Sequence, residues 1–261
     1  MTTQTSMETH DAAGAIARAL TLVYGVGTYL FFFCTFLYLI GFVGNWVVPK
    51  GIDDGTPAAS AGTAIAINVL LLGLFAVQHT IMARPAFKEV WTRWMPWHLE
   101  RATFVLLTTA ILACMAWQWR PLPVPVWQIE HPLAAALLVG ISLAGWGIVL
   151  ISTFLIDHFE LFGLKQCISY ALGRPHEHPT FKERLFYKWV RHPLMLGFLI
   201  AFWATPIMSQ GHLLFAIVTT VYVLLALQIE ERTLVHLHGE RYRDYQRRVP
   251  MLLPLGSRRK G

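Results

Sequence analysis

Five long blocks without a single Asp, Glu, Lys or Arg constrain this chain more than any other feature of its sequence. A helix needs about 20 apolar residues to cross a hydrocarbon core of about 30 Å. The blocks cover residues 19–43, 62–82, 102–119, 133–156 and 193–229. Only 14% of the residues are charged, against about 25% in an ordinary soluble domain. The sequence therefore predicts an all-α, polytopic integral membrane protein with one membrane domain over residues 1–261.

The last block is too long for one span. It would measure about 55 Å as a straight helix at 1.5 Å per residue, and Pro206 and the turn at 209–211 lie near its middle. Proline and glycine interrupt helices, so a helical hairpin is expected over 193–229. The predicted architecture is four single spans over 19–156, the substrate half, followed by a cofactor-binding half over 157–261 that ends in a cytoplasmic tail.

Charge sets the expected orientation. Alternate segments between the blocks hold 19 of the 21 Lys and Arg residues. The positive-inside rule places these segments, and both termini, in the cytoplasm. The sequence pI of 9.4 then reflects membrane orientation and attraction to lipid head groups. Nothing in the sequence supports a nucleic-acid partner.

The distribution of charged residues also argues against some classes of function. Transporters usually place ionisable residues at mid-membrane, and the blocks contain no acidic residue, Lys or Arg. A cytoplasmic pocket is therefore expected instead of a transport path. The three cysteines have no CxxC spacing, and the histidines at 176, 178, 236 and 238 fit no metal motif, so no metal is expected.

Two polar motifs border the hairpin. Arg191-His192-Pro193 opens it, where proline suits a first helical turn and free N–H groups can bind a carboxylate. Glu230-Glu231 closes it, against both the positive-inside trend and the helix dipole. These motifs predict a ligand site at the cytoplasmic face. Interfacial anchoring of the first motif, and surface salt bridges of the second, are the plainer alternatives.

Together with their surroundings, these motifs resemble a known family. Arg191 to Gly197, the Glu230-Glu231 pair, Gly239 to Tyr245 and the stretch from Val249 resemble the C-terminal signature of the isoprenylcysteine carboxyl methyltransferases, with Met195 in place of the usual tyrosine. Residues 78–88, 157–166 and 197–206 are similar to the nurim-like branch, which includes bacterial methanethiol S-methyltransferases. The resemblance covers most of residues 62–255.

The resemblance implies methyl transfer from S-adenosyl-L-methionine to methanethiol, giving dimethyl sulfide, by a bacterial inner-membrane enzyme. It implies that His192 and Pro193 meet the cofactor and that Glu230 holds its ribose or amino group. The full set of implied cofactor contacts is Gln166, Tyr187, Arg191, His192, Pro193, Glu230, Glu231 and Tyr242.

The thiolate is the nucleophile, so a thiol acceptor needs a base. His79 or His158 is the expected base and Asp157 the residue that orients it, because histidine titrates near neutrality. The alternative is that these groups only hydrogen-bond backbone at span ends. A small apolar thiol arriving through membrane lipid would pass residues such as Arg84, Phe198, Phe202 and Trp203.

Two other functions stay open at this point. One is methylation of a larger substrate, such as a prenylated cysteine or another lipid-soluble acid. The other is a nurim-like membrane protein without enzymatic activity, or one that serves nitrogen-oxide metabolism. Cofactor binding separates the enzymes from the last group, and the methylated product separates the enzymes from each other.

Overall fold

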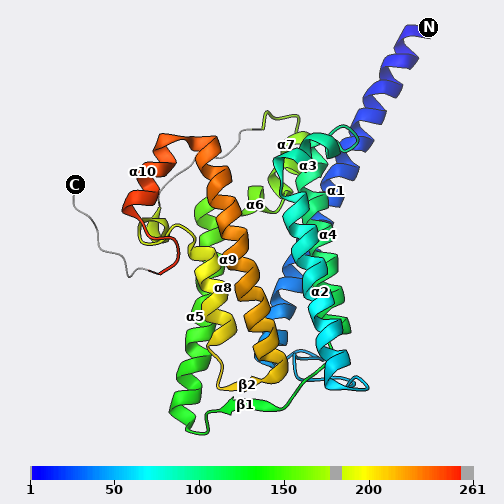
Figure 1. Ribbon diagram of the computed structural model, residues 1–261. Helices are drawn as coiled ribbons and strands as arrows, with labels where there is room; N and C mark the ends of the chain where they lie inside the picture. Colours follow the sequence, from blue (N-terminus) through cyan, green and yellow to red (C-terminus); the bar gives the residue numbers. More distant parts are fainter. Residues whose placement is uncertain (1, 177–183, 254–261) are drawn as a thin grey trace. The chain divides into compact units, whose positions relative to one another are not determined.

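The computed structural model describes residues 2–176 and 184–253, which fold mainly into helices (Figure 1). Five described helices are long and apolar enough to cross a membrane: Gly14–Gly44, Ala61–Met82, Trp97–Gln118, Pro132–Ile156 and Gln210–His238. The expected all-α membrane architecture is confirmed. In chain order the elements are α1 (Thr2–Gly44), α2 (Ala61–Met82), α3 (Pro85–Trp91), α4 (Trp97–Gln118), β1 (Pro125–Gln128), α5 (Pro132–Ile156), α6 (His158–Leu161), α7 (Leu164–Ala171), a 3-10 turn η1 (Leu185–Lys188), α8 (Pro193–Trp203), β2 (Ile207–Ser209), α9 (Gln210–His238) and α10 (Glu240–Arg248).

The fifth apolar block is a hairpin, as expected, but its two arms differ in length. α8 has 11 residues and α9 has 29, or about 16 Å and about 43 Å at 1.5 Å per residue. Pro206 disfavours helical backbone at the residue before it, and α8 ends at Trp203. α9 begins where the Ser209 hydroxyl accepts the His212 N–H at 3.0 Å.

The short arm α8 packs directly on α5. A Cβ added to Gly145 would lie 2.7 Å from the Gly197 carbonyl oxygen, and one added to Gly197 would lie 2.7 Å from the Gly145 carbonyl oxygen. The Ser142 hydroxyl donates to the Ala201 carbonyl at 2.9 Å across the same interface. Small residues therefore bring the two backbones into contact, as is common between membrane helices.

A two-stranded ribbon departs from the expected all-helical pattern. β1 pairs with β2 in antiparallel register, with Pro125 opposite Ser209, Gln128 opposite Ile207 and an irregularity between them. The ribbon lies at the end of α8 and α9 opposite α10 (Figure 1). It satisfies backbone groups where the chain reverses between the two arms of the hairpin.

Contacts divide the chain into two compact units that interleave along the sequence. Unit 1 comprises Met1–Leu37, Val77–Ala113 and Asp157–Thr180, and unit 2 comprises Tyr38–Ala76, Cys114–Ile156 and Phe181–Gly261. In unit 1, Phe32 and Phe162 pack on a core that includes Phe104. In unit 2, Met195 and Met251 pack on a core that includes Leu227. The assignment of a substrate half and a cofactor half stays a prediction.

Candidate functional site

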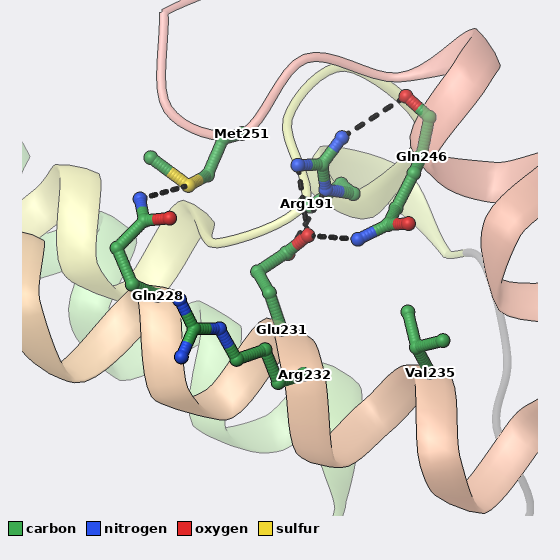
Figure 2. A pocket seen from close by; sticks show the side chains of 7 residues that line it. All are labelled: Arg191, Gln228, Glu231, Arg232, Val235, Gln246 and Met251. Atoms are coloured by element: carbon green, nitrogen blue, oxygen red, sulfur yellow. Dashed lines mark hydrogen bonds and ion pairs between the residues drawn. The ribbon is translucent and has the colours of Figure 1, made fainter.

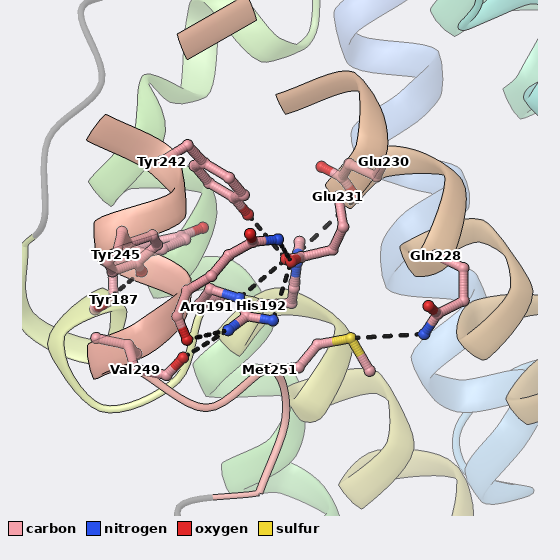
Figure 3. Close-up of polar contacts among 11 residues, drawn as sticks. Tyr187, Arg191, His192, Gln228, Glu230, Glu231, Tyr242, Tyr245, Val249 and Met251 are labelled. Atoms are coloured by element: carbon pink, nitrogen blue, oxygen red, sulfur yellow. Dashed lines mark hydrogen bonds and ion pairs between the residues drawn. The ribbon is translucent and has the colours of Figure 1, made fainter. Parts of the chain in front are cut away.

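Three segments of unit 2 meet at one end of α8 and α9 (Figure 3). The residues just before α8 supply Arg191 and His192, the last turns of α9 supply Glu231, and α10 supplies Tyr242. Gly239 has a φ of 57°, a left-handed conformation that favours glycine, and it lets α10 turn back from the end of α9. The two motifs that border the hairpin are thus brought together by the fold.

Glu231 is the centre of this cluster, and its side chain is only 9% exposed. Its Oε1 accepts hydrogen bonds from Arg191 Nε at 3.0 Å and His192 Nε2 at 2.6 Å. The Tyr242 hydroxyl also donates to Oε1, at 2.8 Å. Its Oε2 is 2.9 Å from Arg191 Nη2 and accepts from Gln246 Nε2 at 2.5 Å. Five donor atoms therefore hold one buried carboxylate, which satisfies its acceptor capacity.

His192 is oriented by this carboxylate. An ionised carboxylate only accepts hydrogen bonds, so the ring Nε2 must donate to Glu231. In a neutral ring the other nitrogen, Nδ1, is then an acceptor, and it lies 3.8 Å from Glu230 Oε2. The Glu230 side chain is 49% exposed. The two adjacent acids therefore have different surroundings. Glu231 is held by hydrogen bonds from protein groups, whereas Glu230 faces outward beside the His192 ring.

Arg191 attaches the C-terminal segment to the site. Its Nη1 donates to two carbonyls of this segment, at 3.1 and 2.6 Å. The backbone N–H groups of Arg191 and His192 donate to two more, at 2.9 and 3.1 Å. The four acceptors are the carbonyls of Gln246, Val249, Pro250 and Met251. Arg191 therefore positions both the carboxylate of Glu231 and the chain that follows α10.

Two tyrosines of α10, Tyr242 and Tyr245, are buried, and a third tyrosine, Tyr187, lies in η1. Tyr245 donates from its hydroxyl to the Tyr187 carbonyl at 2.6 Å. Burial, together with the hydrogen bond to Glu231, raises the pKa of Tyr242. Burial also raises the pKa of Tyr187, with Tyr245 and Glu230 adding to the effect. These two phenols stay protonated at neutral pH, which keeps Tyr242 a hydrogen-bond donor.

An open pocket of about 460 Å³ adjoins the cluster (Figure 2). Its lining comprises Arg191, Gln228, Glu231, Arg232, Val235, Gln246 and Met251. Only Arg191 and Glu231 of this lining were predicted as site residues, so Gln228, Arg232, Val235, Gln246 and Met251 are additions from the structure. Gln246 carried a usable signal, because it lies four residues after Tyr242 and so on the same face of α10. Gln228 and Met251 gave none, since they meet only through the tertiary fold.

The expected apolar substrate residues lie further along α8. Phe198 stacks on Phe202 with ring centroids 5.6 Å apart, and Trp146 of α5 meets both rings edge-on at 5.7 Å. The Trp203 indole N–H donates to the Thr220 hydroxyl at 2.9 Å. Phe202 is about 14 Å from the start of α8 by helical rise. The structure therefore gives these residues a packing role within unit 2.

In unit 1, His158 is buried among aromatic rings. Its Nε2 lies 2.9 Å from the Tyr29 hydroxyl, and the rings of Phe159 and Phe162 are within 5.3 and 4.9 Å. Burial lowers the pKa of His158, although the nearby Asp157 charge acts in the opposite direction. The imidazole is therefore neutral at pH 7 and able to accept a proton.

Asp157 caps the short helix α6. Its Oδ1 accepts the Glu160 N–H at 3.2 Å, and its Oδ2 accepts from Lys165 Nζ at 2.6 Å. Burial raises the pKa of Asp157, but these two hydrogen bonds, together with the charges of Lys165 and His158, outweigh burial and hold the pKa below its ordinary value. The carboxylate is thus ionised and has two donors, and its role in orienting a base stays a prediction.

The remaining predicted residues of unit 1 are spread over three elements. His79, near the end of α2, packs against Phe104 with ring centroids 5.2 Å apart. Arg84 precedes α3 at its N-cap position. Gln166 of α7 is buried, and its Nε2 donates to the Glu160 carbonyl at 3.2 Å.

The histidine-containing segments give no support to a metal site. His176 Nε2 lies 3.2 Å from Glu160 Oε1, while Glu177 and His178 fall outside the described residues. In the part of the chain that the structure describes, no three His, Cys, Asp or Glu side chains are grouped so that they could hold a metal ion.

Comparison with known proteins identifies close relatives. The chain is 53% identical to methanethiol S-methyltransferase 2 of Bradyrhizobium diazoefficiens over 91% of each chain. It is 51% identical to the methanethiol S-methyltransferase of Mycobacterium tuberculosis over 91% of this chain and 97% of that one. It is also 29% identical to nurim of Xenopus laevis over 67% of this chain and 64% of nurim. No family model and no solved structure matches the chain.

Proposed function

This chain belongs to the methanethiol S-methyltransferase family, and from that membership we propose that it methylates methanethiol with S-adenosylmethionine as the methyl donor. The products are dimethyl sulfide, S-adenosylhomocysteine and a proton. The observation that carries the proposal is identity at about half of all positions along nearly the whole chain. At that level of identity and coverage, the chemistry of the family is the natural expectation for this member.

The Glu231 cluster of unit 2 suits the polar groups of the donor. The His192 Nδ1 and Glu230 Oε2 are 3.8 Å apart, a spacing that suits two neighbouring hydroxyl groups of a ribose. We assign these two atoms as acceptors for that diol, and Pro193 and Tyr187 as neighbouring contacts. When bound, S-adenosylmethionine supplies an electrophilic methyl group on a sulfonium.

The other predicted cofactor residues of unit 2 act through His192. Arg191 and Tyr242 donate to Glu231, and Glu231 holds the His192 ring in one orientation. Their contribution to catalysis is thus to position the acceptor nitrogen of His192. A ring fixed before binding avoids part of the ordering cost that binding would otherwise carry.

The acceptor thiol needs a base, and His158 is our first candidate. Its ring is neutral at pH 7 because burial lowers its pKa, so the ring nitrogen that carries no hydrogen can take the thiol proton. His79 is the second candidate, and Asp157 contributes a fixed negative charge that favours the protonated ring. The thiolate sulfur then forms the new bond to the methyl carbon in line with the bond that breaks, which requires an approach of about 3–3.5 Å.

Methanethiol is small and apolar, so it partitions into membrane lipid and can reach the site from there. Arg84, Phe198, Phe202 and Trp203 remain candidates for the lining of its path, as the sequence analysis proposed. We further propose that the protein lies in a bacterial inner membrane with both termini in the cytoplasm, because 19 of 21 basic residues fall in the corresponding segments.

Headspace analysis of isolated membranes tests the proposed reaction. Membranes that contain the protein are given methanethiol and S-adenosylmethionine carrying a deuterated methyl group. The expected product is dimethyl sulfide with one labelled methyl group, together with an equal amount of S-adenosylhomocysteine. A Glu230→Gln variant tests the assigned diol contact and should bind the donor more weakly.

Two outcomes would count against the proposal. Donor binding without any dimethyl sulfide would exclude methanethiol and point to a larger acceptor, such as a prenylated cysteine. Absence of donor binding would favour a nurim-like role without methyl transfer.

A further inference from the structure

Arg101, in the second turn of α4, carries a guanidinium to which the proposed reaction has so far given no role. The side chain is largely buried within unit 1. Its Nε donates to the Leu161 carbonyl at 2.7 Å, and its Cζ lies 5.0 Å from the centroid of the Phe104 ring. In the part of the chain that the structure describes, its two Nη atoms make no hydrogen bond. Four N–H donors of a permanent cation are therefore available to a ligand.

The acidic neighbours of Arg101 are paired with other groups. The charges of Glu100 and Glu160 act on Arg101. Glu100 Oε1, however, lies 3.4 Å from Lys88 Nζ, and Glu160 Oε1 lies 3.2 Å from His176 Nε2. Among the described residues, no carboxylate forms a direct ion pair with Arg101. Charged groups that are withdrawn from water are nearly always paired, so an anion from outside the chain is expected beside this guanidinium.

The ring against which Arg101 packs belongs to an apolar core that borders both candidate bases. Phe162 packs on the core that contains Phe104. The His79 ring lies 5.2 Å from the Phe104 ring, and the His158 ring lies 4.9 Å from the Phe162 ring. All of these residues belong to unit 1. Apolar surface beside a single cation suits a small anion with an apolar body, and methanethiolate is such an anion.

The charges near the two histidines differ in sign. The Arg101 charge acts on the His79 ring, whereas the Asp157 charge acts on the His158 ring. A proton taken from the thiol is therefore better stabilised on His158, and the thiolate that remains is better stabilised beside Arg101. This division of roles rests on the proposed function and makes it more specific.

We propose that the Arg101 guanidinium binds the sulfur of methanethiol as the thiolate, which makes Arg101 a catalytic residue of the proposed reaction. The S–H bond breaks as its proton passes to the His158 ring, and the sulfur keeps the electron pair. The sulfur uses that pair to form the bond to the methyl carbon, with S-adenosylhomocysteine as the leaving group. Arg101 keeps its own proton throughout, because a guanidinium does not deprotonate in proteins.

Kinetics of the full chain in detergent test the proposal. At pH 7, Arg101→Gln should lower kcat/KM for methanethiol about tenfold and leave the KM for the donor unchanged, since it removes one charge-assisted contact to the thiolate. Its pH profile should move upward by about one pH unit, because the thiol then ionises only at higher pH. Arg101→Lys keeps the positive charge and should recover most of the activity. Arg93→Gln is the matched control, because Arg93 is an exposed arginine of the same unit, and it should behave as the parent protein does.

Thiocyanate, a small anion with a terminal sulfur, gives a second readout that needs no turnover. It should bind to the parent protein in calorimetry without the donor, compete with methanethiol in kinetics, and bind about tenfold more weakly to Arg101→Gln. Three results would overturn the proposal: unchanged thiocyanate affinity in that variant, competition of thiocyanate with the donor instead of methanethiol, or an activity that falls by the same factor at every pH. If the parent protein makes no dimethyl sulfide but Arg101→Gln still weakens thiocyanate binding, the anion site stands and the proposed methyl transfer fails.

Discussion

Glu230 and Glu231 are adjacent on α9, yet one carboxylate is buried and the other is half exposed. Successive residues of an α-helix point about 100° apart. Glu231 therefore turns toward Arg191 and His192, while Glu230 stays half exposed beside them. The sequence marked the pair as unusual for a cytoplasmic helix end. It could not indicate which carboxylate is buried, because that depends on where α10 packs.

Neutralising each acid in turn should separate the two roles. Glu231→Gln leaves the largely buried Arg191 guanidinium without its counter-charge, so we expect a loss of about 3–5 kcal/mol in the free energy of unfolding. Glu230→Gln should change that free energy by less than about 0.5 kcal/mol, because its side chain is half exposed. It should instead raise the KM for the donor. Thermal unfolding in detergent and donor titration measure the two effects, and equal destabilisation by both variants would contradict the assignment.

Because His158 is buried, we expect the stability of the protein to depend on pH. Burial lowers its pKa in the folded protein, so the unfolded chain takes up the proton first as the pH falls. Stability should therefore decrease as the pH drops below about 6.5, by at most about 1.4 kcal/mol per pH unit for this one group. Unfolding temperatures of the parent protein and of His158→Phe, measured from pH 7.5 to pH 5, check this. Parallel pH profiles for the two proteins would show that His158 does not titrate as described.

Asp157 is a residue whose local role was readable in advance. Asp157 and Glu160 have the spacing of a helix N-cap followed three residues later by an acid. The structure uses Asp157 in that way, since its side chain accepts the Glu160 N–H. A catalytic contribution beyond its charge stays a prediction. Gln166 was named only through the family resemblance, because its buried amide oxygen without a partner is visible only in the folded structure.

At the scale of elements, the position of the hairpin followed from block length and from Pro206, but its packing did not. α5 contains Gly140, Gly145 and Gly147, and sequence alone does not distinguish them. The structure does: a Cβ at Gly145 would meet α8 backbone, whereas Cβ atoms at the other two would meet nothing within 4 Å. The β1–β2 ribbon also could not be predicted from the sequence, because strands of four and three residues are too short to show an alternating pattern.

This difference between glycines gives a matched pair of variants. Gly145→Val should force α5 and α8 apart and lower the free energy of unfolding by about 1–3 kcal/mol, as overpacking does. It should also reduce donor binding, because α8 begins at the Arg191-His192 motif. Gly147→Val, on the same helix, should change little. Thermal unfolding and donor titration of the two variants provide the measurement. Similar stability of both would contradict the close contact between α5 and α8.

At the scale of the whole molecule, charge and not packing sets the expected orientation. The apolar helices could span a bilayer in either direction, because their composition does not distinguish one end of a helix from the other. The basic residues between them break that symmetry, with 19 of 21 in alternate segments. This orientation stays a prediction, and the sequence alone supplies its basis because it depends on counts along the chain. The contacts of Glu231 could not be predicted, since they join residues 40 positions apart.

Fusion reporters test the orientation directly. A fluorescent protein joined after residue 261 should fluoresce, because it folds in the cytoplasm, whereas a periplasmic phosphatase inserted at Gly55 should be active. Gly55 lies in the 42–61 connection, which contains one Lys and no Arg. Five described helices are long enough to span a membrane, so termini on the same side require a sixth crossing, made by the short α8 together with residues 204–209. The site at the start of α8 and the end of α9 would then meet the donor in the cytoplasm, where S-adenosylmethionine is a soluble metabolite. A fluorescent insertion at Gly55 with an active phosphatase at the C-terminus would reverse the orientation and deny the Glu231 cluster access to its proposed ligand.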